Sequence, residues 1–471
     1  MARQPHVVIL GGGPAGVGGA YYLHRHGRGR ATVLEQQQVL GGNAGSFEID
    51  GISVDYGSHR LHHACDPAIL ADLHSLLGDD LVSNPRQGRI RLRGKWVHFP
   101  LKPVDLLLRL DRRFAAGSAR DMLAGALNGR KKNGTGADTF ASVLEATLGP
   151  TICEHFYFPY ARKLWGRGPE DLSGIQARKR VSAATFSKLL RRIFRPPGSG
   201  RFYYPVGGYG RITNALADAA THAGATLLTG ARVTALRAGS DGRGWTVTME
   251  RDGQTQTIDA DYVWSTIPTT ITARMMQPTA PTEVLTAADS ITYRAMVLAY
   301  LVLDVQQFST TDAHYFPEEN VRMTRLSEPK NYPRVSTPEG RTVLCAELPC
   351  QVDDDLWHMS DDRIGELVAA DMERAGIPLP RPPVRVVTRR LKQAYPIYLN
   401  GYEKPFAVLD QWAESLPNFL LYGRQALFAH DNTHHGLYMA SAAVNCLTES
   451  GFDHSRWSEY RDIFAKHVVE D

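Results

Sequence analysis

The sequence predicts an α/β fold, in which a Rossmann-like domain is interrupted by an inserted domain of mixed α+β structure. Three observations support this class. With 471 residues, the chain is longer than one simple core usually needs. It opens on a continuously apolar run, His6–Leu10, which is typical of a central parallel strand. Apolar runs beside glycine-rich turns recur within residues 203–266 and 419–447, so the first domain is expected to be discontinuous.

A glycine motif follows the first strand. Gly11, Gly13 and Gly16 have the spacing G-x-G-x-x-G. In this motif the first glycine permits a tight turn, the second lets the backbone approach a pyrophosphate, and the third lets the next helix pack close to the sheet. Pro14 suits the first turn of a helix, which we expect over residues 15–26.

An acidic residue completes the motif. Gly27 ends the predicted helix, residues 31–34 form a second apolar strand, and Glu35 stands at its end. An acid about 20 residues beyond the glycines accepts a hydrogen bond from a ribose 2′-hydroxyl. Strand, glycines, helix, strand and acid in this order predict a dinucleotide site.

The residues after this acid indicate which dinucleotide binds. A nicotinamide enzyme would continue with a further helix–strand unit, but here Gly41, Gly42, Asn43 and a predicted hairpin over 46–56 follow. This start resembles the FAD-binding segment of the superfamily of amine oxidases, phytoene desaturases and protoporphyrinogen oxidases. The segments GGNA and GSHRLHH, the latter with His59, are similar to those of UDP-galactopyranose mutase, which belongs to the same superfamily. The alternative is that the two glycines only form a turn.

Composition excludes several other classes. The chain is 43% hydrophobic and 22% charged, with a net charge of +4, as in an ordinary globular protein. It has no basic repeat and no zinc-ligand spacing, so no nucleic-acid partner is expected. The five cysteines form no C-x-x-C pair and favour reduced thiols in a cytoplasmic protein. No apolar run approaches the roughly 20 residues of a membrane-spanning helix, and no signal peptide is evident.

The inserted domain is expected to begin shortly after residue 85. We predict helices over 66–77, 103–130 and 139–148, a hairpin over 90–99 and a loop over 131–136. The hairpin and the residues after it are similar to an uncharacterised bacterial branch labelled protoporphyrinogen oxidase-like. Residues 157–173 resemble a segment of that branch and of the mutase, in which a tryptophan lines the substrate pocket. The resemblance gives this role to Trp165, with Arg162 beside it; the alternative is a core aromatic residue.

A strongly basic segment follows, in which residues 178–201 contain eight arginines and lysines. Such a charge run is most often the solvated face of a helix. Two functional alternatives stay open. The arginines could hold an anionic substrate, or the segment could contact an acidic membrane surface peripherally, because apolar residues lie at near-helical spacing among the charges.

The chain then returns to the first domain. A glycine-rich turn with Tyr209 precedes a predicted helix over 211–223 and two strands. In the superfamily, the backbone at the position of Val233 contacts the adenine end of FAD. A hairpin over 245–258 and a buried strand over 261–266 follow. Together these segments predict a FAD-binding domain of residues 1–85, 203–288 and 405–471, and a substrate domain of residues 86–202 and 289–404.

The second part of the substrate domain starts with a long strand over 290–304. It carries Arg294, which matches a mutase arginine that holds substrate phosphate. A structural salt bridge is the alternative, because a charge within an apolar strand needs a partner. Strands over 343–348 and 384–394 and a helix over 364–375 follow, and then Tyr395 and Tyr398 in a tyrosine-rich stretch that the oxidase-like branch shares.

The last segment closes the FAD domain. We predict a strand over 419–422, a turn at Gly423 and Arg424, and a helix over 436–447. In the superfamily, the amides at the start of this helix point at the flavin pyrimidine oxygen, where negative charge gathers on reduction. The resemblance therefore places His434 and His435 beside the isoalloxazine. Two histidine clusters lack Cys, Asp or Glu at ligand spacing, so no metal is expected: His59, His62 and His63, and His430, His434 and His435.

The resemblance covers nearly the whole chain and implies a FAD-dependent enzyme. The implied cofactor contacts are Gly11, Gly13, Pro14, Ala15, Gly16, Glu35, Gly41, Gly42, Asn43, His59, Val233, Gly423, Arg424, His435, Gly436 and Leu437. The implied catalytic residues are His59, Trp165, Arg294 and His434. The implied substrate contacts are Arg162, Trp165, Tyr209, Arg294, Tyr395 and Tyr398.

Two reactions on a small-molecule substrate are compatible with these residues, and an anionic substrate is one option. In the first, oxidised flavin accepts a hydride at N5, as in desaturases and oxidases. In the second, reduced flavin attacks a sugar anomeric carbon without net redox change, as in the mutase. Trp165, Arg294 and GGNA favour the second reaction. However, AHDNTHH replaces the acidic C-terminal segment of the mutase, and its paired tyrosines do not match cleanly. An oxidoreductase is therefore the first hypothesis, and a FAD-binding scaffold without catalysis is a third alternative.

Overall fold

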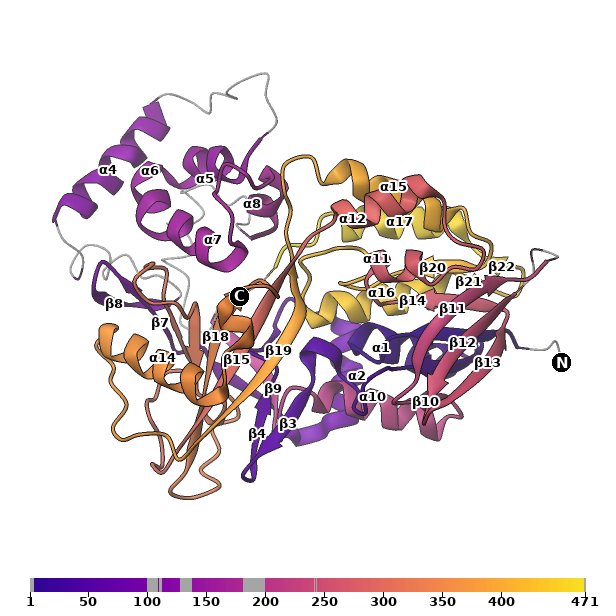
Figure 1. The fold of residues 1–471 in the computed structure, drawn as a ribbon, viewed down its shortest axis with the longest axis horizontal. Coiled ribbons are helices and arrows are strands. Elements are labelled where there is room, and N and C mark those ends of the chain that lie inside the picture. Colours follow the sequence, from indigo (N-terminus) through magenta and orange to yellow (C-terminus); the bar gives the residue numbers. More distant parts are fainter. Residues whose placement is uncertain are drawn as a thin grey trace.

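The structure of this protein is a computed structural model that describes residues 4–99, 109, 112–127, 138–180, 200–240, 242 and 244–469. A five-stranded parallel sheet with the order β10-β2-β1-β14-β20 organises one half (Figure 1). Its strands are β1 (His6–Leu10), β2 (Arg30–Leu34), β10 (Thr226–Leu228), β14 (Tyr262–Ser265) and β20 (Phe419–Leu421). Strands β1, β14 and β20 are almost fully buried, which explains their unbroken apolar sequences.

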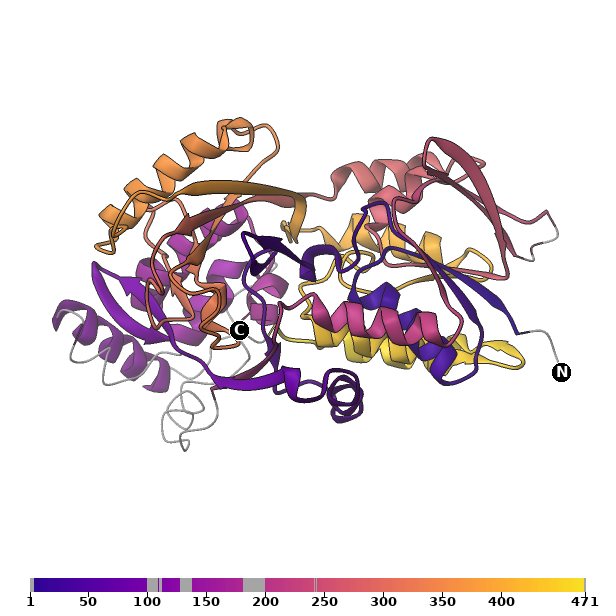
Figure 2. The same ribbon diagram turned by 90° about the horizontal axis from the view of Figure 1, so that it is seen from below.

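Helices cover this sheet and an antiparallel sheet extends it. Helix α1 (Pro14–Arg25) packs against both α10 (Arg211–His222) and α16 (Thr433–Cys446), which Figure 2 shows from below. The helices α11 (Thr269–Arg274), α12 (Thr282–Ser290), α15 (Glu403–Glu414) and α17 (His454–Phe464) form a second group. The antiparallel sheet of β11 (Arg232–Ala238), β12 (Trp245–Arg251) and β13 (Gln254–Ala260) lies near the N-terminus.

A seven-stranded sheet organises the other half, in the order β19-β15-β18-β17-β16-β7-β8. Its strands are β7 (Gly88–Leu92), β8 (Lys95–Phe99), β15 (Tyr293–Leu303), β16 (Ala313–Tyr315), β17 (Arg325–Ser327), β18 (Thr342–Cys350) and β19 (Arg385–Pro396). Helix α14 (Asp361–Arg374) packs on it through Ile364, Val368 and Met372. The helices α4 (Arg112–Leu127), α5 (Phe140–Leu148), α6 (Pro150–Ile152), α7 (Phe158–Trp165) and α8 (Gly174–Arg180) gather beside its end.

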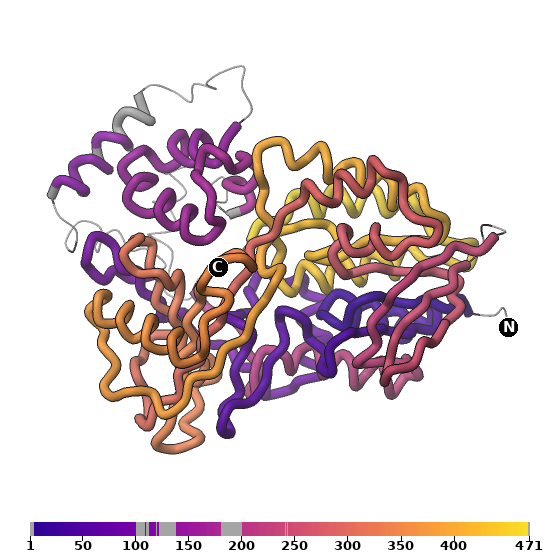
Figure 3. The backbone as a smooth tube through the Cα atoms, in the orientation of Figure 1, coloured from indigo at the N-terminus to yellow at the C-terminus, as the bar shows by residue number. Residues whose placement is uncertain are grey.

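Short strands connect the two halves. The hairpin of β3 (Ser46–Ile49) and β4 (Ile52–Asp55) and the small sheet β5-β9-β6 lie between the large sheets (Figure 3). The small sheet consists of β5 (Leu61–His62), β6 (Leu81–Pro85) and β9 (Arg201–Pro205), and helix α2 (Pro67–Leu77) follows β5. The backbone passes between the two halves several times, so residues far apart in sequence meet at their junction.

Most predicted elements agree with the structure within a few residues, but one boundary that matters for function was wrong. Helix α16, predicted over 436–447, begins at Thr433, so His434 and His435 lie within its first turn. Asn432 is its N-cap residue, and the Asn432 backbone N–H donates to His435 Nδ1 at 3.2 Å. The predicted loop 131–136, most of the basic segment 178–201 and parts of the predicted helix 103–130 lie outside the described residues.

Two further features bear on the sequence predictions: the state of the cysteines and the length of the helices. All five cysteines are unpaired and buried, in agreement with the predicted reduced thiols. Within the described part of the chain, no helix combines the length and the apolar composition that crossing a bilayer requires.

Candidate cofactor and substrate site

A cavity of about 1000 Å³ lies at the junction of the two halves. Its lining includes Gly11, Gly13 and Glu35 from the parallel-sheet half, and Arg325 and Glu347 from the seven-stranded half. In open parallel sheets, ligands bind outside the carboxyl ends of the strands. Gly11 and Glu35 directly follow β1 and β2 at that edge. The cavity is therefore placed where a dinucleotide and a second molecule can meet.

Three glycines shape the wall next to β1. Gly11 has a φ of +102°, and a Cβ there would lie 2.6 Å from Thr266 Oγ1. A Cβ on Gly16 would collide with the Gly11 carbonyl oxygen, so only glycine lets α1 start this close to the turn. At Gly13, by contrast, a Cβ would meet nothing within 4 Å. The Gly13 backbone thus borders open space that a phosphate group can enter.

Glu35 is held at the end of β2 by two backbone amides. Its Oε2 accepts from Gly12 N at 2.7 Å and its Oε1 accepts from Gln37 N at 2.8 Å. The residue is only 8% exposed, yet it lines the cavity. Each carboxylate oxygen can accept more than one hydrogen bond, so acceptor capacity remains for a ribose hydroxyl.

A second turn packs against the first. Gly41 and Gly42 have φ values of +111° and +52°, which favour glycine. A Cβ on Gly42 would lie 3.5 Å from the Gly13 Cα, which shows how closely the two turns approach. Asn43 Nδ2 donates to the Gln393 carbonyl oxygen at 3.3 Å and so links this turn to the second half of strand β19. Gly42 and Asn43 line the cavity, and their contact with the cofactor stays a prediction.

The first turns of α1 and α16 meet at Ala15. A Cβ on Gly436 would lie 3.6 Å from Ala15 Cβ, and a Cβ on Gly423 would lie 2.9 Å from the same atom. Pro14, Ala15 and Gly436 line the cavity, whereas Gly423 and Leu437 do not and support it from behind. Two helix N-termini therefore border one cavity, and unpaired N–H groups with the helix dipole favour an anion there.

The cavity extends beyond Glu35 along residues that follow it in the chain. Gln37, Val39 and Leu40, which the sequence did not single out, line the cavity beyond Glu35. Val233 lies on β11, is 7% exposed and is not part of this lining. Its backbone contact with adenine stays a prediction.

His59 lines the cavity in a defined protonation state. Its Nε2 lies 3.0 Å from the Tyr56 carbonyl oxygen, and because a carbonyl only accepts, Nε2 carries the proton. Burial lowers the pKa of His59, although the nearby Asp55 acts in the opposite direction. The imidazole is therefore neutral at neutral pH, with an unprotonated Nδ1. Its ring stacks on Tyr209, with the centroids 5.4 Å apart.

A buried carboxylate holds Tyr209 in place. Asp55 is 1% exposed and accepts hydrogen bonds from Ser46 Oγ at 2.6 Å, Tyr204 OH at 2.7 Å and the Tyr209 backbone N–H at 2.9 Å. Burial raises the pKa of Asp55, and these hydrogen bonds oppose that rise. This network fixes the Tyr209 ring, a predicted substrate contact, against the cavity.

Basic side chains dominate the charged lining. Arg325 and Glu347 form a bidentate pair with Nε–Oε1 and Nη2–Oε2 distances of 2.8 Å. Arg60 lies over the rings of Phe202 and Tyr332, with its Cζ 5.3 and 5.1 Å from their centroids. Among the described residues, seven basic and three acidic side chains line the cavity: Arg60, Arg86, Arg325, Arg389, Arg390, Lys392 and Arg424, against Glu35, Glu347 and Asp431. Only Glu35 and Arg424 of these ten were predicted.

Arg424 and Tyr395 form a further part of the lining, as the sequence predicted. Arg424 Nη2 donates to the Ala394 carbonyl oxygen at 2.9 Å, and its Cζ lies 5.3 Å from the Tyr395 ring centroid. Tyr398 is buried behind them and donates from its hydroxyl to the Phe428 carbonyl oxygen at 2.7 Å. Direct substrate contact by Tyr398 therefore stays a prediction, and its present contacts are those of a supporting residue.

Three other predicted substrate residues lie away from this cavity. Trp165 is 2% exposed and packs edge-on against Phe140, at a centroid distance of 5.3 Å. Arg294 is 8% exposed and donates from Nη2 to the carbonyl oxygens of Pro349 and Lys163, at 3.3 and 3.4 Å. Arg162 is exposed and pairs with Glu319 through its Nε at 2.8 Å. These contacts favour structural roles, and direct substrate contact stays a prediction.

His434 and His435 also differ from the expected arrangement. Neither lines the cavity, and both lie within the first turn of α16 instead of preceding it. His434 is 3% exposed, and neither ring nitrogen has a hydrogen-bond partner among the described residues. Burial lowers the pKa of His434 to about 3, so the ring is neutral. The neighbouring His430 does line the cavity, and Gln176 Nε2 lies 2.8 Å from its Nε2.

The fold and the cavity define a dinucleotide-binding α/β protein with room for a second ligand. A family model described as flavin containing amine oxidoreductase matches residues 14–445, and the chain belongs to this family. The glycine cradle, the fixed Glu35 and the two helix N-termini fit a dinucleotide pyrophosphate and ribose. FAD is the cofactor, and the family is one of flavin-dependent oxidoreductases.

Solved structures support the same fold. A reduced UDP-galactopyranose mutase superposes with a TM-score of 0.81 and 20% identity, over 99% of this chain and 100% of that one. A protein assigned as a protoporphyrinogen oxidase from Exiguobacterium sp. 255-15 gives a TM-score of 0.73 and 21% identity, over 94% and 98% of the two chains. These identities are low, so the similarity shows the fold alone.

One curated relative is similar in sequence. A phytoene dehydrogenase from Streptomyces griseus is 26% identical over 276 residues, which are 50% of this chain and 50% of that protein. The match thus spans about half the length of the relative.

Proposed function

We propose that this protein is a FAD-dependent oxidoreductase that takes a hydride equivalent from an anionic small molecule. The observation that carries the proposal is the composition of one cavity, in which the FAD cradle is continuous with seven basic and only three acidic side chains. Of the acids, Glu35 serves the ribose and Glu347 is paired with Arg325. The basic side chains outnumber the acidic ones, so the cavity carries a net positive charge. This charge suits a cofactor pyrophosphate together with a second anion.

When bound, FAD supplies a hydride acceptor at flavin N5. The chain itself supplies binding, orientation and a proton acceptor. Neutral His59, whose Nδ1 is unprotonated, can take a proton from the substrate as its C–H or C–N bond is oxidised. Stacking on Tyr209, which the buried Asp55 holds, keeps the His59 ring in one orientation.

Arg60 and Arg86 are the side chains that we assign to the anionic group of the substrate. Both line the cavity. Arg60 Nη1 lies 3.3 Å from Tyr315 OH, and its guanidinium lies against two aromatic rings, which limits its movement. A preorganised guanidinium in a partly buried site binds a carboxylate or phosphate more strongly than one in water.

A UDP-galactopyranose mutase-like reaction on a nucleotide sugar is the second candidate. The same basic cavity supports it, because a diphosphate is also an anion, and the overall fold matches that of the mutase. Family membership favours an enzyme over a non-catalytic scaffold. The two candidates differ in the flavin oxidation state from which each reaction starts.

Anaerobic flavin spectra test the choice. The oxidised holoenzyme should be mixed with porphyrinogens, polyenes, amines and nucleotide sugars, and visible flavin absorbance recorded. Bleaching by a substrate that is not a sugar supports the oxidoreductase. In parallel, dithionite-reduced enzyme should receive UDP-sugars, with products analysed for furanose forms. Furanose product from reduced enzyme alone, without net electron consumption, would overturn the first proposal in favour of the mutase-like reaction.

We further propose the division of the chain that the sequence suggests. Residues 1–85, 203–288 and 405–471 would form the FAD-binding domain, and residues 86–202 and 289–404 the substrate domain. The composition of the two large sheets supports this division. The parallel sheet takes its strands from the first set of residues, and the seven-stranded sheet takes its strands from the second.

A further inference from the structure

The C-terminal residues 464–469, here called the C-terminal strap, return from α17 to the centre of the molecule. Figure 1 shows the C-terminus at the junction of the two halves. Val469 lines the cavity. Its backbone N–H donates to the Lys179 carbonyl oxygen at 2.9 Å, and Lys179 Nζ donates back to the Phe464 carbonyl oxygen at 3.3 Å. Both ends of the strap are thus tied to α8, on the other side of the junction from α17.

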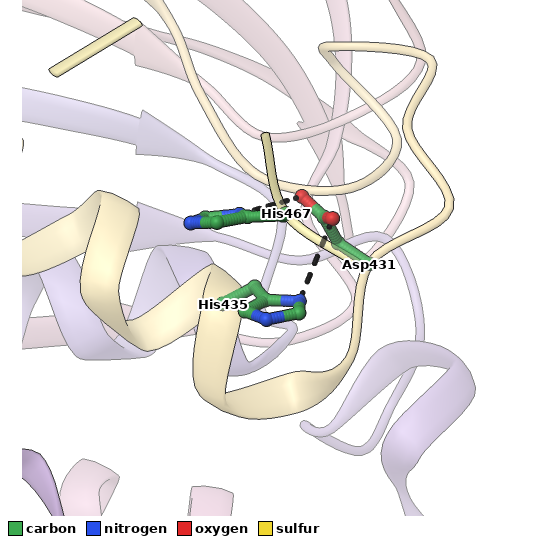
Figure 4. Close-up of side chains that lie close together, drawn as sticks. All are labelled: Asp431, His435 and His467. Atoms are coloured by element: carbon green, nitrogen blue, oxygen red, sulfur yellow. Dashed lines mark hydrogen bonds and ion pairs between the residues drawn. The ribbon is translucent and has the colours of Figure 1, made fainter. Parts of the chain in front are cut away.

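The strap is also tied to the start of α16. His467 Nδ1 lies 3.4 Å from Asp431 Oδ2, and His435 Nδ1 lies 3.5 Å from Asp431 Oδ1 (Figure 4). The two imidazole rings stack on each other, with centroids 4.1 Å apart and planes 14° from parallel. The Asp431 side chain is 1% exposed, and those of His467 and His435 are 11% and 12% exposed. One buried carboxylate therefore holds a histidine of the strap against a histidine of the cavity-forming helix.

The geometry opposes a metal ion at this cluster, although an aspartate and two histidines are common ligands. An imidazole nitrogen binds a metal along its lone pair, which lies in the ring plane. Because the two rings are stacked nearly parallel, an ion between their Nδ1 atoms would lie well outside at least one ring plane. The cluster is better explained as a carboxylate that bonds to His467 and lies beside His435, whose Nδ1 accepts from the Asn432 N–H.

The charge on Asp431 makes this attachment specific. Burial alone would raise the pKa of Asp431, but the neighbouring imidazoles of His435 and His467 outweigh burial and lower it. The group is therefore a buried carboxylate that depends on its histidine partners, and losing one partner is costly. Between these anchors the side chains of Ala465 and Lys466 are exposed, and their backbone N–H groups donate to carbonyl oxygens of α17. A segment with few anchors beside a cavity can open locally.

We propose that the C-terminal strap is a gate over the active-site cavity: exchange of FAD or substrate with solvent requires His467 to leave Asp431 and Val469 to leave Lys179. In the closed state the strap forms part of the cavity wall and limits the access of water. This role is the same whether the flavin reacts by hydride transfer or as in a mutase, because it concerns only the opening of the cavity.

Two measurements on the FAD-loaded protein test the gate. The first is quenching of flavin fluorescence by iodide, and the second is the rate of FAD release after dilution. His467→Ala should increase the release rate roughly tenfold, as expected for loss of one hydrogen bond to a charged group, and should increase iodide quenching. Lys466→Ala is the matched control, because this neighbouring side chain is exposed, and both values should stay at wild type.

A second variant addresses the other anchor without touching the histidine cluster. Val469→Pro removes the N–H that bonds to Lys179 and should shift both measurements in the same direction as His467→Ala. Wild-type values in both His467→Ala and Val469→Pro would overturn the gate. If EDTA treatment of wild type reproduced the His467→Ala effect and Zn²⁺ reversed it, a metal would hold the strap and the proposed attachment would be wrong.

Discussion

Replacing Gly13 by alanine separates cofactor binding from folding. Gly13 has φ −76° and ψ 178°, an extended conformation that alanine adopts without strain. A Cβ there meets no protein atom within 4 Å. The apoprotein should therefore fold and melt like wild type. If the pyrophosphate of FAD occupies the open space beside Gly13, however, the added methyl group must collide with it.

The size of the effect follows from the cost of overpacking. One extra methyl group in a well-packed site costs about 1–3 kcal/mol, which is roughly a 5- to 150-fold rise in the Kd for FAD. Gly16→Ala provides the contrast. Its Cβ would collide with the Gly11 carbonyl oxygen, so α1 itself must move and the apoprotein should lose stability as well.

The assay is reconstitution of apoprotein with FAD, followed by flavin fluorescence, together with thermal melts of each apoprotein. Gly13→Ala should have a normal apoprotein melting temperature and weakened FAD binding. Wild-type affinity in Gly13→Ala would refute the placement of the pyrophosphate at this turn. An equal loss of apoprotein stability in Gly13→Ala and Gly16→Ala would refute the inference that Gly13 borders open space.

Three further predictions concern the ribose, the substrate anion and pH. Glu35→Gln should weaken FAD binding by roughly tenfold or more, measured by the same titration, because a charged acceptor for the ribose hydroxyl becomes neutral. Arg60→Gln should raise KM for an anionic substrate while FAD content stays normal; an unchanged KM would remove Arg60 from the substrate site. His434 has a pKa of about 3 in the folded protein, below the unfolded value of about 6.5. The unfolded chain therefore takes up the proton first, and stability should fall as the pH drops below about 6.5. Between about pH 7 and pH 5 the loss is about 2 kcal/mol, and urea denaturation should show this part of the pH dependence disappearing in His434→Leu.

The cofactor cradle could be predicted from sequence because its parts are local. Gly11, Gly13, Gly16 and Glu35 belong to one strand–helix–strand unit, in which spacing fixes geometry. The structure places all four where the motif requires. The start of α16 could also have been found, because Asn432 is a favourable N-cap residue three positions before His435. The prediction instead starts this helix at Gly436, which is too far along the chain.

The substrate side of the cavity could not be predicted in the same way. Arg325 meets Glu347 only because β17 pairs antiparallel with β18 in a register that puts these two residues opposite each other. His467 meets Asp431 only because the strap returns across the molecule. Both contacts join residues far apart in the sequence, and no local sequence pattern predicts either contact. The excess of basic residues at the cavity likewise depends on which faces of β17, β19 and the turns become buried, and spacing alone does not show this.

The position of Arg294 bears on the choice between the two reactions. In the sequence, Arg294, Trp165 and GGNA favoured a mutase-like reaction, and Arg294 did so through a phosphate contact. In the structure, the Arg294 guanidinium lies against Gly166 and donates to the Lys163 and Pro349 carbonyl oxygens. Burial lowers the pKa of Arg294, because the charged guanidinium is removed from water. Its hydrogen bonds go to carbonyl oxygens and not to a carboxylate. These contacts use Nη2 alone, and Nε of Arg294 has no hydrogen-bond partner among the described residues, so a phosphate contact by Arg294 stays a prediction. Arg60 and Arg86 already line the cavity. An anionic substrate can therefore be bound by Arg60 and Arg86 in either reaction, and the choice between the two reactions does not depend on Arg294 alone.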